Sequence, residues 1–154
     1  MYKYIITFSL LIIFGCAGSL QVIETERKFQ KTFDNLELNK SDIYIKSLQW
    51  LAKSFVDSKE VIEFQDENTG KIIGKGMSSV IFNPTLIAPI NINIQYTLTI
   101  EIKDNKARIT YSNFYSEDVG GGQIMEDNYL KLEPKLEALS LNYQNYLMSE
   151  EEDW

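Results

Sequence analysis

The 154-residue sequence contains no histidine, and this absence excludes several kinds of chemistry. Without an imidazole, the chain lacks the usual general base, the commonest nitrogen ligand for metals and any nucleophile activated by histidine. A single cysteine, Cys16, excludes an internal disulfide, a Cys-X-X-Cys redox pair and a thiolate metal cage. We therefore expect a protein that is not an enzyme and that uses no metal and no cofactor.

Basic residues are also scarce. Lysine and arginine total 15 against 22 acidic residues, which gives a formal net charge of -7 at pH 7. Domains that bind nucleic acid usually carry a basic surface, so this balance argues against a nucleic-acid partner. The length and the 44% share of hydrophobic residues correspond to one globular domain with short extensions.

The N-terminal apolar run is too short to span a bilayer. Lys3 followed by apolar residues from Ile5 to Phe14 is typical of a signal peptide, whereas a membrane-spanning helix needs about 20 such residues. The next residues, Ile13-Phe14-Gly15-Cys16, resemble the lipobox of bacterial lipoproteins, in which an aliphatic and a small residue precede an invariant cysteine. The resemblance implies that residues 1–15 are a lipoprotein signal peptide and that acylated Cys16 anchors the chain to a membrane.

The residues after Cys16 bear on the location of the protein. In lipoproteins of the Bacteroidetes type, an acidic run after the cysteine is associated with export to the cell surface, and residues 17–22 contain no acid. We therefore expect a lipid-anchored protein of the cell envelope, held in the outer membrane and facing the periplasm, with residues 16–26 as a tether. A plain secretory signal with an incidental cysteine, or an N-terminal helix of a cytoplasmic protein, are the alternatives.

Two helices are predicted from apolar periodicity. Asn39 or Ser41 can cap the first helix, and Trp50 is expected at the edge of its apolar stripe. Pro134 suits the first turn of the second helix. The apolar stripe of the first helix comprises Tyr44, Leu48, Leu51, Ala52 and Phe55, and that of the second comprises Leu132, Leu136, Leu139, Tyr143, Tyr146 and Leu147.

Strands are predicted from alternation of apolar and polar residues. The longest runs from Ile90 to Lys103, with one dry and one wet face, and Asp104-Asn105 turns the chain into the next strand. Prolines in Asn83-Pro84 and Ala88-Pro89 predict a loop or a sheet edge before it. Further strands are predicted over residues 28–33, 61–65, 72–77 and 107–112, with a turn over residues 66–70.

Two segments are predicted to lie outside the regular elements. Gly120-Gly121-Gly122 predicts a flexible loop between Glu117 and Asp127, because glycine loses the most conformational freedom inside a strand. Residues 149–154 form an acidic tail that is not expected to fold by itself. Its final residue, Trp154, is either a docking tag for a partner or an ordinary tail residue.

The order of strand, helix, antiparallel strands and helix resembles one repeat of the TATA-box-binding-protein (TBP) fold. The segments Tyr44 to Phe55, Val61 to Asp66 and Gly70 to Gly76, with Tyr96 to Lys103 and Ala107 to Thr110, resemble the DUF4468 family. The match covers Phe29 to Leu147. The resemblance implies an α+β fold over residues 27–148: a curved, antiparallel, TBP-like sheet with two helices packed on one face. The family occurs mostly in Bacteroidetes lipoproteins and secreted proteins, and it supplies no catalytic residues.

The wet face of the strand over residues 90–103 is the predicted binding face. It presents Asn91, Asn93, Gln95, Thr97 and Thr99, and it is expected to be polar without a charged patch. We expect this face to bind an envelope protein or a glycan. The alternative function is a small-ligand carrier or a carboxylate-based enzyme, with the loop Gly120–Gly122 as a lid. A purely structural role in envelope integrity is a third alternative.

Two patterns near the first hairpin have structural interpretations. The spacing within Gly70–Gly76 is wrong for a phosphate-binding loop, and its glycines Gly74 and Gly76 are expected to allow a helix to pack closely. Glu63, Asp66 and Glu67 are expected to be a surface cluster, because no loop with metal-ligand spacing follows them.

Two further patterns involve a cation and the aromatic residues. Arg108 either pairs with Glu101 across the strands or anchors the carboxylate of a ligand. Six tyrosines and phenylalanines fit a small core and its rim, because no basic residues interleave with them as in a base-stacking surface. This group comprises Tyr96, Tyr111, Phe114, Tyr115, Tyr143 and Tyr146.

Overall fold

The secondary structure follows the predicted order. The computed structural model describes residues 27–55, 62–83, 88–118 and 122–149. The elements are β1 (Phe29–Asp34), α1 (Lys40–Ser54), β2 (Ile62–Asp66), β3 (Lys71–Phe82), β4 (Ile90–Lys103), β5 (Lys106–Ser116), β6 (Gly122–Gln123) and α3 (Glu126–Met148). The predicted signal peptide, Cys16, the tether before residue 27, and residues 150–154 with Trp154 lie outside the described residues.

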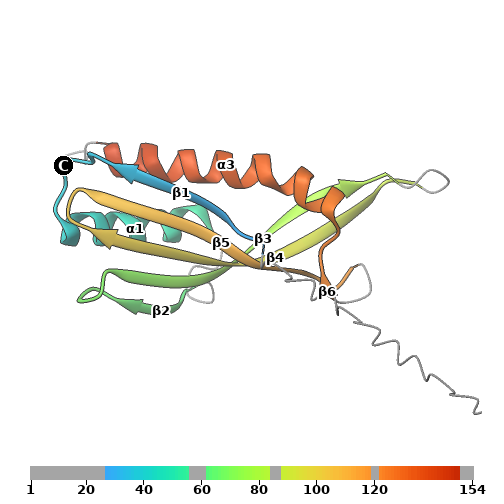
Figure 1. Cartoon of the computed structure of the whole chain (residues 1–154), viewed down its shortest axis with the longest axis horizontal. Helices are drawn as coiled ribbons and strands as arrows, with labels where there is room; N and C mark the ends of the chain where they lie inside the picture. The colour runs from blue at the N-terminus through green and yellow to red at the C-terminus, as the bar shows by residue number, and fades with distance from the viewer. Residues whose placement is uncertain (1–26, 56–61, 84–87, 119–121, 150–154) are drawn as a thin grey trace, which may run out of the picture.

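The strands form one antiparallel sheet in the order β1-β5-β4-β3-β2, and β6 pairs with the far end of β5. The long strand β4 is central, because it pairs with β3 from Lys71↔Glu101 to Phe82↔Ile90 and with β5 along its other edge. The sheet is strongly twisted and curved, and the hairpin of β3 and β4 extends well beyond β2 (Figure 1).

Both helices cover the same face of this sheet. α3 contacts β1 and β3, α1 contacts β4, and the two helices contact each other (Figure 1). The dry face of β4 lies beneath them, where Ile92, Ile94, Tyr96, Leu98, Ile100 and Ile102 are all buried. On the opposite face, none of the residues that the structure describes forms a covering helix. The predicted arrangement of two helices on one face of a curved antiparallel sheet is therefore confirmed.

The first helix begins as predicted but buries a different set of residues. Asn39 caps α1, because its side chain accepts a hydrogen bond from the backbone N–H of Asp42 over 2.9 Å. Ala52, predicted in the apolar stripe, is exposed, whereas Ser47 and Trp50 are buried. The prediction that Trp50 lies at the edge was wrong, because α1 packs against α3 as well as against the sheet and so buries a wider arc.

The second helix begins earlier than predicted. α3 starts at Glu126, so Pro134 lies in its third turn instead of its first. Proline removes one backbone donor, which leaves the carbonyl of Leu130 without its partner within the helix. Leu130 and Pro134 are both exposed, so water can bind that carbonyl. Neither described helix has the combination of length and apolar residues needed to cross a membrane.

Two glycine predictions need correction. Gly122 lies in the short strand β6 and not in a loop, and its φ of 152° is in a region that favours glycine. Residues 119–121, the rest of the predicted lid region, lie outside the described part.

A methyl group at Gly76 would overlap the ring of Tyr96 on the neighbouring strand. Gly76 therefore makes room for a side chain of the sheet, and not for a helix as predicted.

Candidate binding face

The five residues of the predicted binding face lie together on β4, on the side of the sheet away from both helices. Asn91, Asn93 and Gln95 are exposed, and Thr97 and Thr99 are half-buried. They share one side because alternate residues of a strand point to the same face. We call this side, with the outward residues of the neighbouring strands, the open face.

Hydrogen bonds between strands hold some of these side chains in place. Ser79 of β3 lies opposite Asn93 and donates to its Oδ1 over 2.7 Å. Asn113 of β5 donates from Nδ2 to the hydroxyl of Thr97 over 3.1 Å. The side chains of Asn93 and Thr97 are therefore oriented by the sheet itself, and ordered side chains lose less conformational entropy in any contact they make.

The open face also carries exposed apolar side chains that the sequence analysis did not place there. Met77 of β3 and Tyr115 of β5 lie on either side of Gln95, with 60% and 38% of their surfaces exposed. Ile81 lies opposite Asn91 and is 56% exposed. On the edge strand β2, Phe64 is 47% exposed. The face is thus a mixture of amides, hydroxyls and apolar groups.

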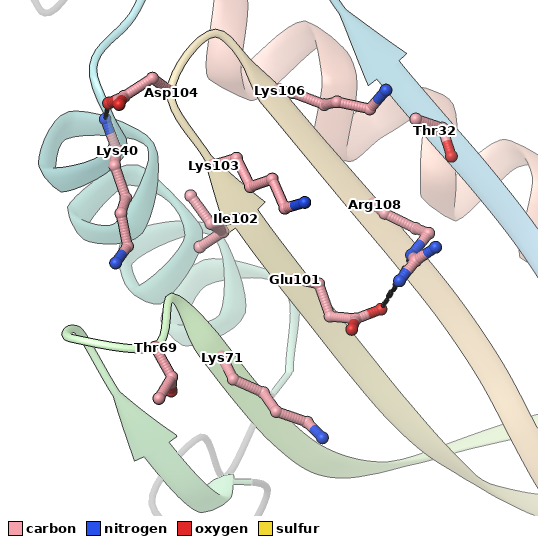
Figure 2. Close-up of a pocket in the computed structure, with 10 residues that line it drawn as sticks. All are labelled: Thr32, Lys40, Thr69, Lys71, Glu101, Ile102, Lys103, Asp104, Lys106 and Arg108. Carbon is pink, nitrogen blue, oxygen red and sulfur yellow. Dashed lines mark hydrogen bonds and ion pairs between the residues drawn. The ribbon is translucent and has the colours of Figure 1, made fainter.

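The end of the open face around Lys71, Lys103 and Arg108 is basic. This contradicts the expectation of a face without a charged patch. A hollow of about 740 Å³ lies there, between the start of α1, the start of β3 and the turn joining β4 and β5 (Figure 2). Its charged lining consists of five cations, Lys40, Lys71, Lys103, Lys106 and Arg108, and two acids, Glu101 and Asp104. We call this feature the basic hollow. The sequence did not reveal it because four separate elements contribute the cations.

Three of these cations have partners. Arg108 donates from Nε and Nη2 to one oxygen of Glu101, over 2.8 and 2.5 Å, so the predicted cross-strand pair is confirmed. Lys106 pairs with Asp34 over 2.7 Å. Lys40 donates to the backbone carbonyl of Asn68 over 2.6 Å.

The remaining two lysines of the hollow are Lys71 and Lys103. Neither forms an ion pair or a side-chain hydrogen bond with any residue that the structure describes. Lys71 lies directly opposite Glu101, whose carboxylate already accepts from Arg108 on the other side. The hollow therefore has two ammonium groups available for a ligand.

The acidic residues near the first hairpin, Glu63, Asp66 and Glu67, each contact a different neighbour and do not form one cluster. Glu63 pairs with Lys75 over 2.5 Å, and Glu67 accepts from Ser41 over 2.7 Å. A hydrogen bond from the hydroxyl of Thr69 is the main reason that the pKa of Asp66 is lowered. Within the described ranges, no group of three or more acidic, cysteine or histidine residues could hold a metal.

The aromatic residues lie mainly inside the molecule, as predicted. Tyr96, Tyr111, Phe114 and Tyr143 are buried, whereas Tyr115 and Tyr146 are partly exposed at the rim. Burial raises the pKa of Tyr96, Tyr111 and Tyr143. The buried tyrosines are therefore neutral and structural at physiological pH.

An antiparallel sheet with both helices on one face defines an α+β domain with a TBP-like fold. The chain belongs to the family described as "Domain of unknown function (DUF4468) with TBP-like fold", whose model matches residues 29–117. The resemblance inferred from the sequence is thereby confirmed. A comparison with curated proteins gives no match.

Two solved structures have a similar fold. One is a DUF4468 family protein from Bacteroides ovatus, 13% identical, with a TM-score of 0.68 over 90% of this chain and 95% of that one. The other is a TBP-like protein from Parabacteroides distasonis, 15% identical, with a TM-score of 0.64 over 82% of this chain and 95% of that one. At these identities the likeness shows the fold, and function has to be argued from the surface of this chain.

Proposed function

We propose that this protein is a non-enzymatic binding module of the cell envelope and that its open face binds an envelope protein. The observation that carries the proposal is the row formed by Met77, Gln95 and Tyr115 across three strands. It places an exposed thioether, an amide and a phenol side by side. Methionine and tyrosine are enriched at protein interfaces, where apolar contact is combined with a few oriented hydrogen bonds.

The aliphatic content of the open face favours a protein over a glycan as the partner. Glycans are bound through hydrogen bonds to their hydroxyls, which Asn91, Asn93 and Gln95 could provide, and by stacking on aromatic rings such as that of Tyr115. Exposed Met77 and Ile81 would add little to such a site, whereas burying both would favour binding to the apolar surface of another protein. The other side of the sheet is already occupied by α1 and α3.

The proposed location rests on the lipobox-like residues that end in Cys16. Acyl chains on this cysteine would hold the domain at a membrane, and residues 16–26 would connect the two. Metabolic labelling with a palmitate analogue tests the anchor. We expect label in the wild type and none in Cys16→Ala, and equal labelling of both proteins would contradict the lipoprotein assignment.

Variants of the open face test the binding function. We would express the tagged full-length protein in its own host, crosslink the envelope gently and compare the wild type with Met77→Glu/Ile81→Glu, whose two carboxylates do not lie opposite each other. Both positions are exposed, so the double substitution should leave the fold intact. The control is Asn145→Glu, which adds one carboxylate, against two in the double variant, at an exposed position on α3.

The proposal predicts one defined protein that is captured by the wild type and by Asn145→Glu but not by the double variant. Capture that is unchanged in the double variant would show that the open face is not the interface. Capture of a glycan in place of a protein would overturn the choice of partner.

A further inference from the structure

We infer that the basic hollow binds a phosphate group that carries two negative charges. This site lies on the open face, but it uses other residues than the row of Met77, Gln95 and Tyr115 proposed above, because its lining belongs to the Glu101–Lys103 end of β4. The chain as a whole has a net charge of -7, yet the hollow gathers five cations against two acids. An anion would therefore be attracted to this part of an otherwise acidic protein.

The register of the sheet creates the excess of positive charge. Lys103 and Lys106 lie directly opposite each other at the end of the β4–β5 ladder, and like charges at such positions destabilise a sheet. Asp34 offsets Lys106 through an ion pair, whereas Lys103 has no ion pair within the described residues. A bound anion would remove the repulsion that remains at Lys103.

A second row of the sheet supplies the other available cation. Lys71, Glu101 and Arg108 lie side by side on three neighbouring strands. Glu101 accepts both hydrogen bonds from Arg108, so this acid is engaged on the side away from Lys71. Figure 2 shows Lys103 extending across the sheet face toward the pair of Glu101 and Arg108.

Lys71 and Lys103 have no ion pair with any described residue, and two such ammonium groups match the charge of a dianion better than that of a single carboxylate. A phosphomonoester carries about 1.5 to 2 negative charges at neutral pH and has three acceptor oxygens. Lysine binds phosphate as a point charge on a flexible stem, so Lys71 and Lys103 can adjust to reach one group. The volume of the hollow, about 740 Å³, is within the range of small-molecule sites.

Isothermal titration of the detergent-solubilised full-length protein with inorganic phosphate, at constant ionic strength, tests the site. We expect saturable binding by the wild type and a loss of roughly tenfold or more in affinity for Lys71→Gln/Lys103→Gln, since both charge-assisted contacts are removed. The matched control is Lys75→Gln, on the same face of β3 but already paired with Glu63. The affinity of Lys75→Gln for the probe should be within about twofold of the wild-type affinity, because an exposed ion pair contributes little.

A parallel titration with dihexanoyl phosphatidic acid, a soluble lipid, distinguishes a headgroup from a free phosphate compound. Binding of either probe that depends on Lys71 and Lys103 supports the site, and the stronger probe identifies the source. No saturable binding of either probe, or equal weakening by Lys75→Gln, would overturn the inference. Neither result involves Met77 or Gln95, so a failure here leaves the proposed protein interface to its own test.

Discussion

Trp50 of α1 donates its indole N–H to the side-chain oxygen of Asn142 on α3, with 2.8 Å between Nε1 and Oδ1. The indole ring also packs against Tyr143, with 4.8 Å between ring centroids. A hydroxyl pair between Ser47 and Tyr143, 2.7 Å apart, adds a second polar contact between the helices. The two helices are therefore joined to each other as well as to the sheet.

Truncation of Trp50 should strongly destabilise the domain. Trp50 is 1% exposed, so Trp50→Ala removes a large buried side chain and leaves a cavity between the helices. We expect a loss of about 3–5 kcal/mol in the free energy of unfolding, measured by denaturant titration. Asn142→Ala, which removes only the hydrogen bond, should lose about 0.5–1.5 kcal/mol. Similar small losses for both variants would show that the interface between the helices contributes little.

Gly76 should tolerate no side chain while Tyr96 is present. The added methyl group of Gly76→Ala would overlap the Tyr96 ring, which is itself buried against Tyr111 with 5.5 Å between centroids. Because the ring cannot move freely, we expect a loss of about 1–3 kcal/mol in unfolding free energy. In a Tyr96→Leu background the same change should be less costly, and a double-mutant cycle measures the difference. Additive losses would contradict this explanation.

Alkaline pH should destabilise the fold through the buried tyrosines. Burial raises the pKa of Tyr96, Tyr111 and Tyr143 above the usual value of about 10, so the folded state holds these protons more tightly than the unfolded state. The stabilisation is fully present below pH 10 and is lost as the pH rises from there toward the folded-state values.

Thermal unfolding between pH 8 and 11.5 measures this dependence. Tyr143→Phe removes one of the three titrating groups and should flatten the decline above pH 10. A wild-type melting temperature that stayed constant up to pH 11.5 would be inconsistent with buried tyrosine side chains.

Two lysines of α3 should keep β3 from pairing with another chain. β2 pairs with β3 only up to Gly74, and beyond it Lys135 and Lys131 donate to the backbone carbonyls of Ser79 and Ile81 over 2.7 and 3.1 Å. Edge strands with unoccupied carbonyls promote association. Lys131→Ala/Lys135→Ala should therefore increase concentration-dependent oligomers in sedimentation experiments. An unchanged monomer fraction would show that the lysines do not protect this edge.

Local patterns were sufficient to predict most of the fold. The strand over residues 90–103 was predicted with its observed bounds, because strict alternation identifies both the strand and its buried face. Asn39 was one of two predicted caps, and its side chain makes the capping bond. Pro134 misled the prediction of α3, because a proline on an exposed helix face is tolerated beyond the first turn.

The exposed apolar residues of β3 and the basic hollow could not be predicted from the sequence, because both depend on the register in which the strands pair. Met77, Ser79 and Ile81 alternate with residues that are also mostly apolar or small, so their outward side could not be chosen before pairing with β4 was known. The basic hollow likewise depends on Lys71 and Arg108 lying on either side of Glu101. Such neighbours are brought together only by the folded sheet.

The most direct test of the proposed function is a photocrosslinking measurement on the open face. Benzoylphenylalanine at Tyr115, a partly exposed aromatic position beside Gln95, would be compared in the native host with the same group at Asn145, an exposed position on α3. The proposal predicts that illumination links one defined envelope protein to the group at Tyr115 and not to the group at Asn145. Crosslinks from Asn145 alone, or none from Tyr115, would contradict a binding role for the open face.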